Sequence, residues 1–148
     1  LVTALSEMAP EWGMNVVEAP AARSADVFGA AQSLVGRADV IYVPTDNTIV
    51  SALEAVLAVG RNAQIPVFTG DTDSVRRGAV ASIGFDYYQL GRQTGEIVTR
   101  VLRGEDPGDI PVAFAQGSDL FVNPDAAQAM GVTLPPDLLA RANVVAGQ

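Results

Sequence analysis

Residues 39–48 read Asp-Val-Ile-Tyr-Val-Pro-Thr-Asp-Asn-Thr, an apolar run that ends in polar residues just before a helical pattern over residues 49–57. A similar arrangement recurs in residues 65–74, which read Ile-Pro-Val-Phe-Thr-Gly-Asp-Thr-Asp-Ser. Each stretch predicts a buried strand followed by a polar turn that caps the next helix. In open α/β sheets, ligands bind at this carboxyl edge of the strands. The two stretches therefore predict an α/β fold with a binding place for a small molecule.

Strands and helices are expected to alternate along most of the chain, as they do in parallel βαβ units. We expect strands at residues 14–18, 39–43, 65–68, 79–85, 112–114 and 120–122, with Gln116-Gly117-Ser118 joining the last two. We expect helices at residues 1–8, 24–36 (with Ser24 as the N-cap), 47–62, 71–77 and 87–103, and short helices opened by Asn123-Pro124 and Pro135-Pro136.

The composition limits the chemistry that the chain can perform. Its 148 residues include no Cys and no His, and all nine positive charges are Arg. These absences exclude a thiol nucleophile, an imidazole base, a Cys/His metal site and a lysine Schiff base. The net charge of -8 disfavours nucleic acid as a partner, because its phosphates would be repelled. We therefore expect a binding protein rather than an enzyme, with no catalytic residue, cofactor or metal.

The start of the sequence is expected to lie inside an amphipathic helix, with no strand before it. Its apolar residues recur at helical spacing, namely Leu1, Val2, Leu5 and Met8. No signal peptide opens the sequence, and no apolar run approaches the roughly 20 residues of a membrane span. We expect a fragment whose upstream half lies outside the sequence; a domain that begins with a helix is the alternative.

The turn Thr45-Asp46-Asn47-Thr48 is the first candidate site. The simple structural interpretation makes one of these side chains the N-cap of the following helix. A cap needs one polar residue, whereas this turn offers four in succession. Free donors at the start of a helix suit a carboxylate or a hydroxyl-rich ligand, and Asp46 would attract an ammonium group.

The turn around Asp71-Thr-Asp73-Ser-Val75 is the second candidate site, and it has three interpretations. The Asp-x-Asp pattern matches the nucleophile loop of haloacid-dehalogenase-type phosphatases. Those enzymes also need a downstream cation, usually Lys, and a further acidic pair for Mg²⁺, whereas this chain has no Lys. The second interpretation is a purely structural Asx-rich turn. We favour the third, in which Asp71 contacts a bound ligand.

Several motifs taken together resemble one known family. They are the stretch beginning Ile41-Tyr-Val-Pro-Thr-Asp-Asn-Thr, the stretch beginning Val67-Phe-Thr-Gly-Asp-Thr-Asp-Ser, the segment Phe85-Asp-Tyr-Tyr-Gln-Leu-Gly-Arg-Gln-Thr-Gly, and the C-terminal segment from Asn123 to Ala142. The set is similar to ABC-transporter substrate-binding proteins, including the members that bind tryptophan and other aromatic amino acids. The resemblance runs almost from end to end of the chain.

This resemblance implies the type I periplasmic-binding-protein fold, in which two α/β lobes enclose a ligand cleft. The chain would then be a parallel-sheet, three-layer α/β sandwich, mostly the C-terminal lobe. Residues 1–86 would form that lobe without its first strand, and residues 87–111 a crossover helix that normally belongs to the N-terminal lobe. Residues 112–148 would form the return segment and the C-terminal helices. Because a lone lobe would leave a sheet edge and the helix at residues 87–103 uncovered, we also expect the fragment to be a homodimer, or to rearrange so that these surfaces are covered.

The resemblance further implies that both polar turns face the inter-lobe cleft. The expected ligand-binding residues are Thr45, Asp46, Asn47, Thr48, Gly70, Asp71, Thr72 and Asp73. Asp71 or Asp46 is expected to pair with the ammonium group of the ligand. Asn47 and Thr48 are expected to donate hydrogen bonds to its polar groups.

The function implied is that of the solute-binding component of an ABC importer. Its ligand would be a small amino-acid-like molecule, aromatic by analogy with the family, and its partner an ABC permease. The protein would be periplasmic or lipid-anchored outside the cytoplasm. The alternative is a ligand-sensing domain of a regulator or membrane sensor with the same fold.

Overall fold

The structure is a computed structural model that describes residues 2–114 and 118–145. Its strands are β1 (Ile41–Val43), β2 (Val67–Thr69), β3 (Ala81–Gly84), β4 (Asp119–Val122) and β5 (Asn143–Val144). Its α-helices are α1 (Val2–Met8), α2 (Val27–Gln32), α3 (Asn47–Val50), α4 (Leu53–Ala63), α5 (Asp73–Arg76), α6 (Tyr87–Leu102), α7 (Pro124–Ala129) and α8 (Pro136–Arg141). Short 3₁₀ helices cover Ala9–Trp12, Ser24–Asp26 and Pro107–Asp109.

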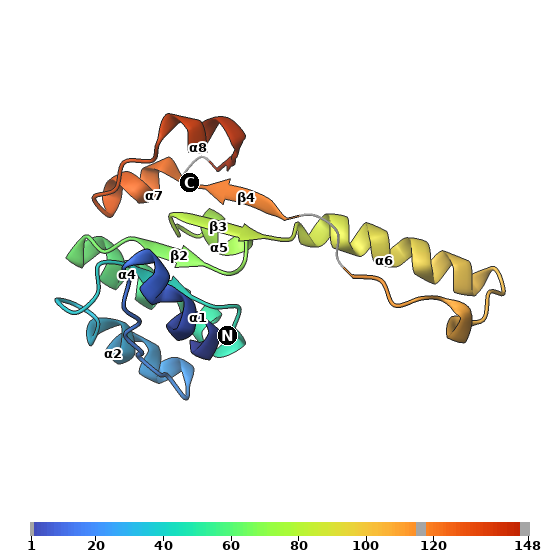
Figure 1. Ribbon diagram of the computed structural model, residues 1–148, viewed down its shortest axis with the longest axis horizontal. Helices are drawn as coiled ribbons and strands as arrows, with labels where there is room; N and C mark the ends of the chain where they lie inside the picture. The colour runs from blue at the N-terminus through green and yellow to red at the C-terminus, as the bar shows by residue number, and fades with distance from the viewer. Residues whose placement is uncertain (1, 115–117, 146–148) are drawn as a thin grey trace.

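The five strands form one sheet in the order β1-β2-β3-β4-β5. The first three strands are parallel, β4 runs antiparallel to β3, and β5 is parallel to β4. The α/β fold class predicted from the sequence is confirmed, and the sheet is mostly parallel with one antiparallel pair. Helices connect the parallel strands and cover the sheet (Figure 1).

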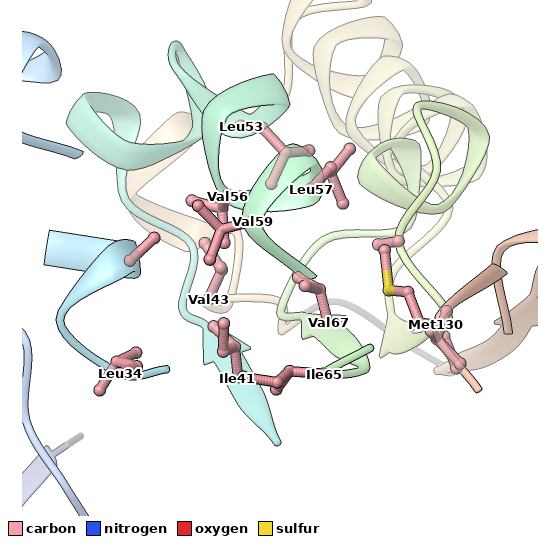
Figure 2. Packing of buried hydrophobic residues seen from close by; sticks show 14 of the residues in the cluster. Leu34, Ile41, Val43, Leu53, Val56, Leu57, Val59, Ile65, Val67 and Met130 are labelled. Carbon is pink, nitrogen blue, oxygen red and sulfur yellow. The ribbon is translucent and has the colours of Figure 1, made fainter. Parts of the chain in front are cut away.

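The main core lies between α4 and the first strands (Figure 2). Leu53 and Leu57 of α4 are completely buried, at 0% and 1% exposure, and so is Val67 of β2. Met130, just after α7, joins the same cluster, so the C-terminal part of the chain closes one end of this core. The apolar spacing of α4 therefore fixes the helix on the sheet, and the sheet in turn positions the turns that follow β1 and β2.

An ion pair between the residue that follows α5 and the first turn of α4 holds these two helices beside each other. Arg77, directly after α5, donates two hydrogen bonds of 2.9 Å to the carboxylate of Glu54 in α4. Hydrogen bonding to the backbone at Glu54 and to Arg77 lowers the pKa of this carboxyl group. The pair lies at the surface and bridges two helices that support the candidate site.

Gly60 lies where α4 approaches β2 most closely. A Cβ atom at this position would lie 2.6 Å from Cγ2 of Val67 and 2.8 Å from the carbonyl oxygen of Ile65. Both neighbours are buried and one is backbone, so neither can move aside freely. The helix needs glycine here for its contact with the sheet rather than for its own conformation.

We expect Gly60→Ala to lower the free energy of unfolding by about 1–3 kcal/mol, because overpacking outweighs the roughly 1 kcal/mol gain in helix propensity. The matched control is Gly29→Ala in α2, where an added Cβ meets no atom within 4 Å. That control is expected to be neutral or slightly stabilising. Urea denaturation of both variants tests the pair, and equal effects of the two substitutions would refute the close-approach argument.

Several elements predicted from the sequence differ in the structure. Residues 14–18 form no strand and pair with no strand of the sheet, so β1 is its edge strand among the described residues. Residues 112–114 also form no strand; Val112 and Phe114 are 84% and 80% exposed in a segment that runs back along α6 (Figure 1). Part of the turn predicted at residues 116–118 lies outside the described residues. The short β5 was not predicted.

Ser24 is not the helix N-cap that the sequence predicts. Its hydroxyl oxygen lies instead within hydrogen-bond distance of the carbonyl oxygen of Thr48, at 3.0 Å, and of the hydroxyl oxygen of Ser51, at 2.8 Å. Ser51 also donates to the Thr48 carbonyl, and the following residue Ala52 has non-helical dihedral angles. This local hydrogen bonding divides the predicted 47–62 helix into α3 and α4.

The long helix α6 extends away from the sheet (Figure 1). None of its residues is buried, and Leu102 at its end is 81% exposed. In the part of the chain that the structure describes, no helix has the length and apolar character needed to cross a membrane.

Candidate functional site

The candidate site lies at the carboxyl ends of the three parallel strands. The backbone N–H of Gly70, just after β2, donates a 2.9 Å hydrogen bond to the carbonyl oxygen of Val43 at the end of β1. The Thr72 hydroxyl donates a 3.2 Å hydrogen bond to the carbonyl oxygen of Phe85, just after β3. The two sequence-predicted turns and the start of α6 therefore lie along one edge of the sheet.

Gly70 brings the two predicted turns into contact. A Cβ atom built on Gly70 would lie 3.0 Å from the hydroxyl oxygen of Thr45 and 3.1 Å from its backbone nitrogen. The hydroxyl oxygen of Tyr42 would also lie 3.1 Å from the same point. Glycine thus lets the second turn pack directly on the first, with the Tyr42 hydroxyl at the junction.

The first turn is polar and largely exposed. Asp46 is the N-cap of α3, and its Oδ1 accepts a 3.0 Å hydrogen bond from the backbone of Ile49. Thr45, Asp46 and Asn47 are exposed, and Thr48 is half-buried. Within residues 2–114 and 118–145, the Asp46 Oδ2 and the side chains of Thr45 and Asn47 have no hydrogen-bond partner. One carboxylate oxygen of Asp46 therefore stays available to a ligand.

The second turn is held together from within. Asp71 is 8% exposed, and its two carboxylate oxygens accept hydrogen bonds of 2.9 Å from the Ser74 backbone and 2.7 Å from the Ser74 hydroxyl. The hydroxyl of Thr69 donates to the backbone carbonyl of Asp71 at 3.0 Å. Thr72 is also buried, whereas Asp73 is exposed at the start of α5. Both carboxylate oxygens of Asp71 therefore stabilise its own turn, whereas only one oxygen of Asp46 does so.

Aromatic side chains surround the point where β3 passes into α6. Phe85, Tyr87 and Tyr88 are 44%, 52% and 70% exposed. Asp86 caps α6, accepting from the backbones of Tyr88 at 2.8 Å and Gln89 at 3.1 Å. Exposed rings beside an exposed polar edge suit a ligand that has both an apolar and a charged part.

The acidic residues of the site do not form a metal centre. Among the described residues, no group of three His, Cys, Asp or Glu side chains is placed to hold a metal ion. Asp71 and Asp73 also differ in environment, one buried and bonded to Ser74 and the other exposed. This arrangement gives no support to the interpretation of the Asp-x-Asp pattern as a phosphatase loop.

Sequence reasoning did not single out Tyr42 as a site residue. Ile41 and Val43 are buried beneath α4, so strand alternation directs Tyr42 to the opposite face of the sheet, where it is 46% exposed. The alternation of Tyr42 with the aliphatic residues Ile41 and Val43 can be recognised from the sequence alone. Its contact with Gly70 depends on the register between β1 and β2, which only the structure provides.

The chain is similar to a curated tyrosine-binding protein and to several solved structures, one of them in complex with L-Trp. It is 40% identical over 129 residues to the tyrosine-binding protein of Clostridioides difficile, covering 87% of this chain and 37% of that protein. A conserved domain protein from Vibrio cholerae matches with a TM-score of 0.86 and 45% identity, covering 96% of this chain and 48% of that one. The ABC domain from Streptococcus pneumonia in complex with L-Trp matches with a TM-score of 0.83 and 28% identity, covering 97% of this chain and 50% of that one.

The chain thus spans about half the length of the solved relatives and little more than a third of the tyrosine-binding protein. The family model for ABC transporter substrate binding proteins matches residues 1–146, and the chain belongs to this family.

Proposed function

We propose that this chain forms one lobe of a two-lobe receptor that delivers an aromatic amino acid to an ABC importer. The observation that carries the proposal is the edge at which β1, β2 and β3 end. There, two polar turns contact each other through Gly70, and the free oxygen of Asp46 lies in one of them. The tyrosine-binding and L-Trp-bound relatives support an aromatic amino acid as the ligand.

The proposed site combines three kinds of contact. The carboxylate of Asp46 pairs with the ammonium group of the ligand, and Asn47 and Thr48 contribute further polar contacts. Gly70, Asp71, Thr72 and Asp73 form the adjoining wall of the cleft. Asp71 acts there mainly by holding its own turn through Ser74, because both its oxygens are already bonded. The exposed rings of Phe85 and Tyr88 offer apolar contacts to the ligand side chain.

The proposed second lobe would pack against α6 and the segment that follows it. This explains why a 16-residue helix has no buried residue while its apolar side chains remain uncovered. In this arrangement the receptor works outside the cytoplasm and docks on an ABC permease. A sensory domain with the same fold is the second candidate, and helix α6 and the polar turns would serve it equally well.

A calorimetric screen of the full-length receptor tests this proposal. We expect L-tryptophan and L-tyrosine to bind and to raise the melting temperature, since a ligand at 100 times its Kd stabilises the native state by about 2.7 kcal/mol. L-alanine and L-glutamate serve as controls that share the amino-acid head group but lack the ring. Binding of no amino acid would refute the proposed ligand class.

A further inference from the structure

Helix α5, which follows the second polar turn, is too short to hold its own position. It has four residues, Asp73–Arg76. An isolated helix shorter than roughly 12–15 residues is at best marginally stable in water. The turn before α5 depends on this helix, because Ser74 supplies both hydrogen-bond donors to the carboxylate of Asp71. The contacts that fix α5 therefore also fix the turn at the candidate site.

Several of these contacts come from β4 and the residues that follow it. Val75 is completely buried and packs in one cluster with Phe121 of β4 and Val145. The guanidinium carbon of Arg76 lies 6.0 Å from the centroid of the Phe121 ring, a distance at which cation–π attraction acts. Asn123, directly after β4, donates a 3.1 Å hydrogen bond from Nδ2 to the carbonyl oxygen of Val75. Asn123 thus holds α5 from a position 48 residues further along the chain.

Asn123 uses both ends of its side-chain amide. It is 3% exposed, and its Oδ1 accepts a 2.9 Å hydrogen bond from the backbone N–H of Ala126, which caps α7. Its own backbone N–H donates to the carbonyl oxygen of Val80, just before β3, at 2.9 Å. One buried residue therefore joins α5, α7 and the sheet. This position needs a group with an acceptor on one branch and a donor on the other, as an amide has.

We propose that Asn123 is a positioning residue for ligand binding. It makes no contact with the ligand. Its amide holds α5, and α5 in turn holds the Asp71 turn through Ser74. This inference rests on the proposed function, in which residues 70–73 form one wall of the cleft. The apparent affinity of a site falls with the fraction of molecules in which that site is correctly formed, so a loosened α5 weakens binding although every ligand contact is still encoded.

Two variants in the full-length receptor remove the donor to Val75 and keep the cap of α7. Asn123→Asp keeps a side-chain oxygen for the Ala126 N–H, but its carboxylate cannot donate to the Val75 carbonyl. Asn123→Ser also caps a helix well, and its hydroxyl lies one bond closer to the backbone than the amide nitrogen. The serine variant adds no charge, so it separates the lost hydrogen bond from the effect of a new carboxylate.

We expect Asn123→Ser to weaken L-tryptophan binding about fivefold or more, as expected for the loss of one hydrogen bond that holds the site. Asn123→Asp should weaken it further, because an anionic oxygen then faces the Val75 carbonyl. Isothermal titration calorimetry measures both affinities. Hydrogen exchange at the backbone N–H of Ser74, which donates to Asp71, reports the turn directly and should become faster in both variants without ligand.

The control for a general loss of stability is Val27→Ala. Val27 is 2% exposed in α2 and belongs to the main core cluster rather than to the cluster that contains Val75. This substitution should lower the melting temperature of the receptor. It should leave the affinity for L-tryptophan unchanged, because it does not touch α5.

The outcomes separate this inference from the proposed function. If wild type binds L-tryptophan and the Asn123 variants bind it equally tightly, the positioning role is wrong while the receptor function stands. If Val27→Ala loses as much affinity for the same loss of melting temperature, Asn123 acts only through overall stability, and the positioning role is again wrong. If wild type binds no amino acid, the proposed function fails and the positioning role in binding fails with it, whereas exchange at Ser74 still shows whether Asn123 holds the turn. If Asn123→Asp does not fold, Asn123→Ser decides.

Discussion

Replacement of Leu57 by alanine is expected to lower the free energy of unfolding of the 148-residue chain by about 2–5 kcal/mol. Leu57 is 1% exposed and lies in the middle of α4, among the side chains that join the helix to β1 and β2 (Figure 2). The substitution removes buried methyl groups and leaves a cavity that the neighbouring strands cannot fill by a small shift.

The control for this prediction is the same substitution at Leu102. That leucine is 81% exposed at the end of α6, so Leu102→Ala should change the stability of the same chain by no more than about 0.5 kcal/mol. Urea denaturation followed by circular dichroism measures both variants. A similar loss at the two positions would mean that α4 does not form the main core.

The sequence predicts the parts of this fold that depend on residues close together along the chain. The apolar run of β1, the polar turn after it and the apolar face of α4 occur in order, so the strand-turn-helix unit was readable without the structure. The same holds for Asn123, whose side chain accepts a 2.9 Å hydrogen bond from Ala126 at the start of α7, as the Asn-Pro pair predicts.

The predictions that failed depend on partners far away in the sequence. Residues 14–18 have the composition of a strand, but a strand forms only where another strand offers hydrogen bonds. Ser24 has the composition of an N-cap, but its hydroxyl finds Thr48 and Ser51, which are more than twenty residues away. The lack of a strand partner for residues 14–18 and the distant hydrogen-bond partners of Ser24 cannot be recognised from the neighbouring residues on which each prediction was based.

In the candidate site, too, the features that depend on neighbouring residues were predicted, and those that depend on specific contacts were not. The polar turns were identified from their positions after two strands, because parallel strands end at one edge of a sheet. The role of each carboxylate was not readable, because Asp46 and Asp71 follow similar strands and stand in similar turns. Their difference arises from Ser74, which occupies both oxygens of Asp71, whereas Ile49 occupies a single oxygen of Asp46.

This difference leads to the second large prediction, for the variant Asp46→Asn in the full-length receptor. Asparagine keeps the side-chain oxygen that caps α3, so stability should be nearly unchanged. It removes the negative charge proposed to pair with the ligand ammonium, a contact worth about 1.5–3 kcal/mol. Affinity for L-tryptophan should therefore fall about tenfold or more in isothermal titration calorimetry.

The comparison with Asp71→Asn separates binding from folding. Asp71 is buried and accepts from both donors of Ser74, so this substitution should cost about 1–2 kcal/mol of stability through the weakened turn. If Asp71 rather than Asp46 contacts the ammonium group, Asp71→Asn will lose affinity while Asp46→Asn binds as wild type does. The sequence offered both carboxylates as partners for the ammonium group. This pair of variants assigns one of them to the ligand and the other to the turn. It can do so because asparagine preserves the cap at position 46, whereas it disturbs the Ser74 contacts at position 71.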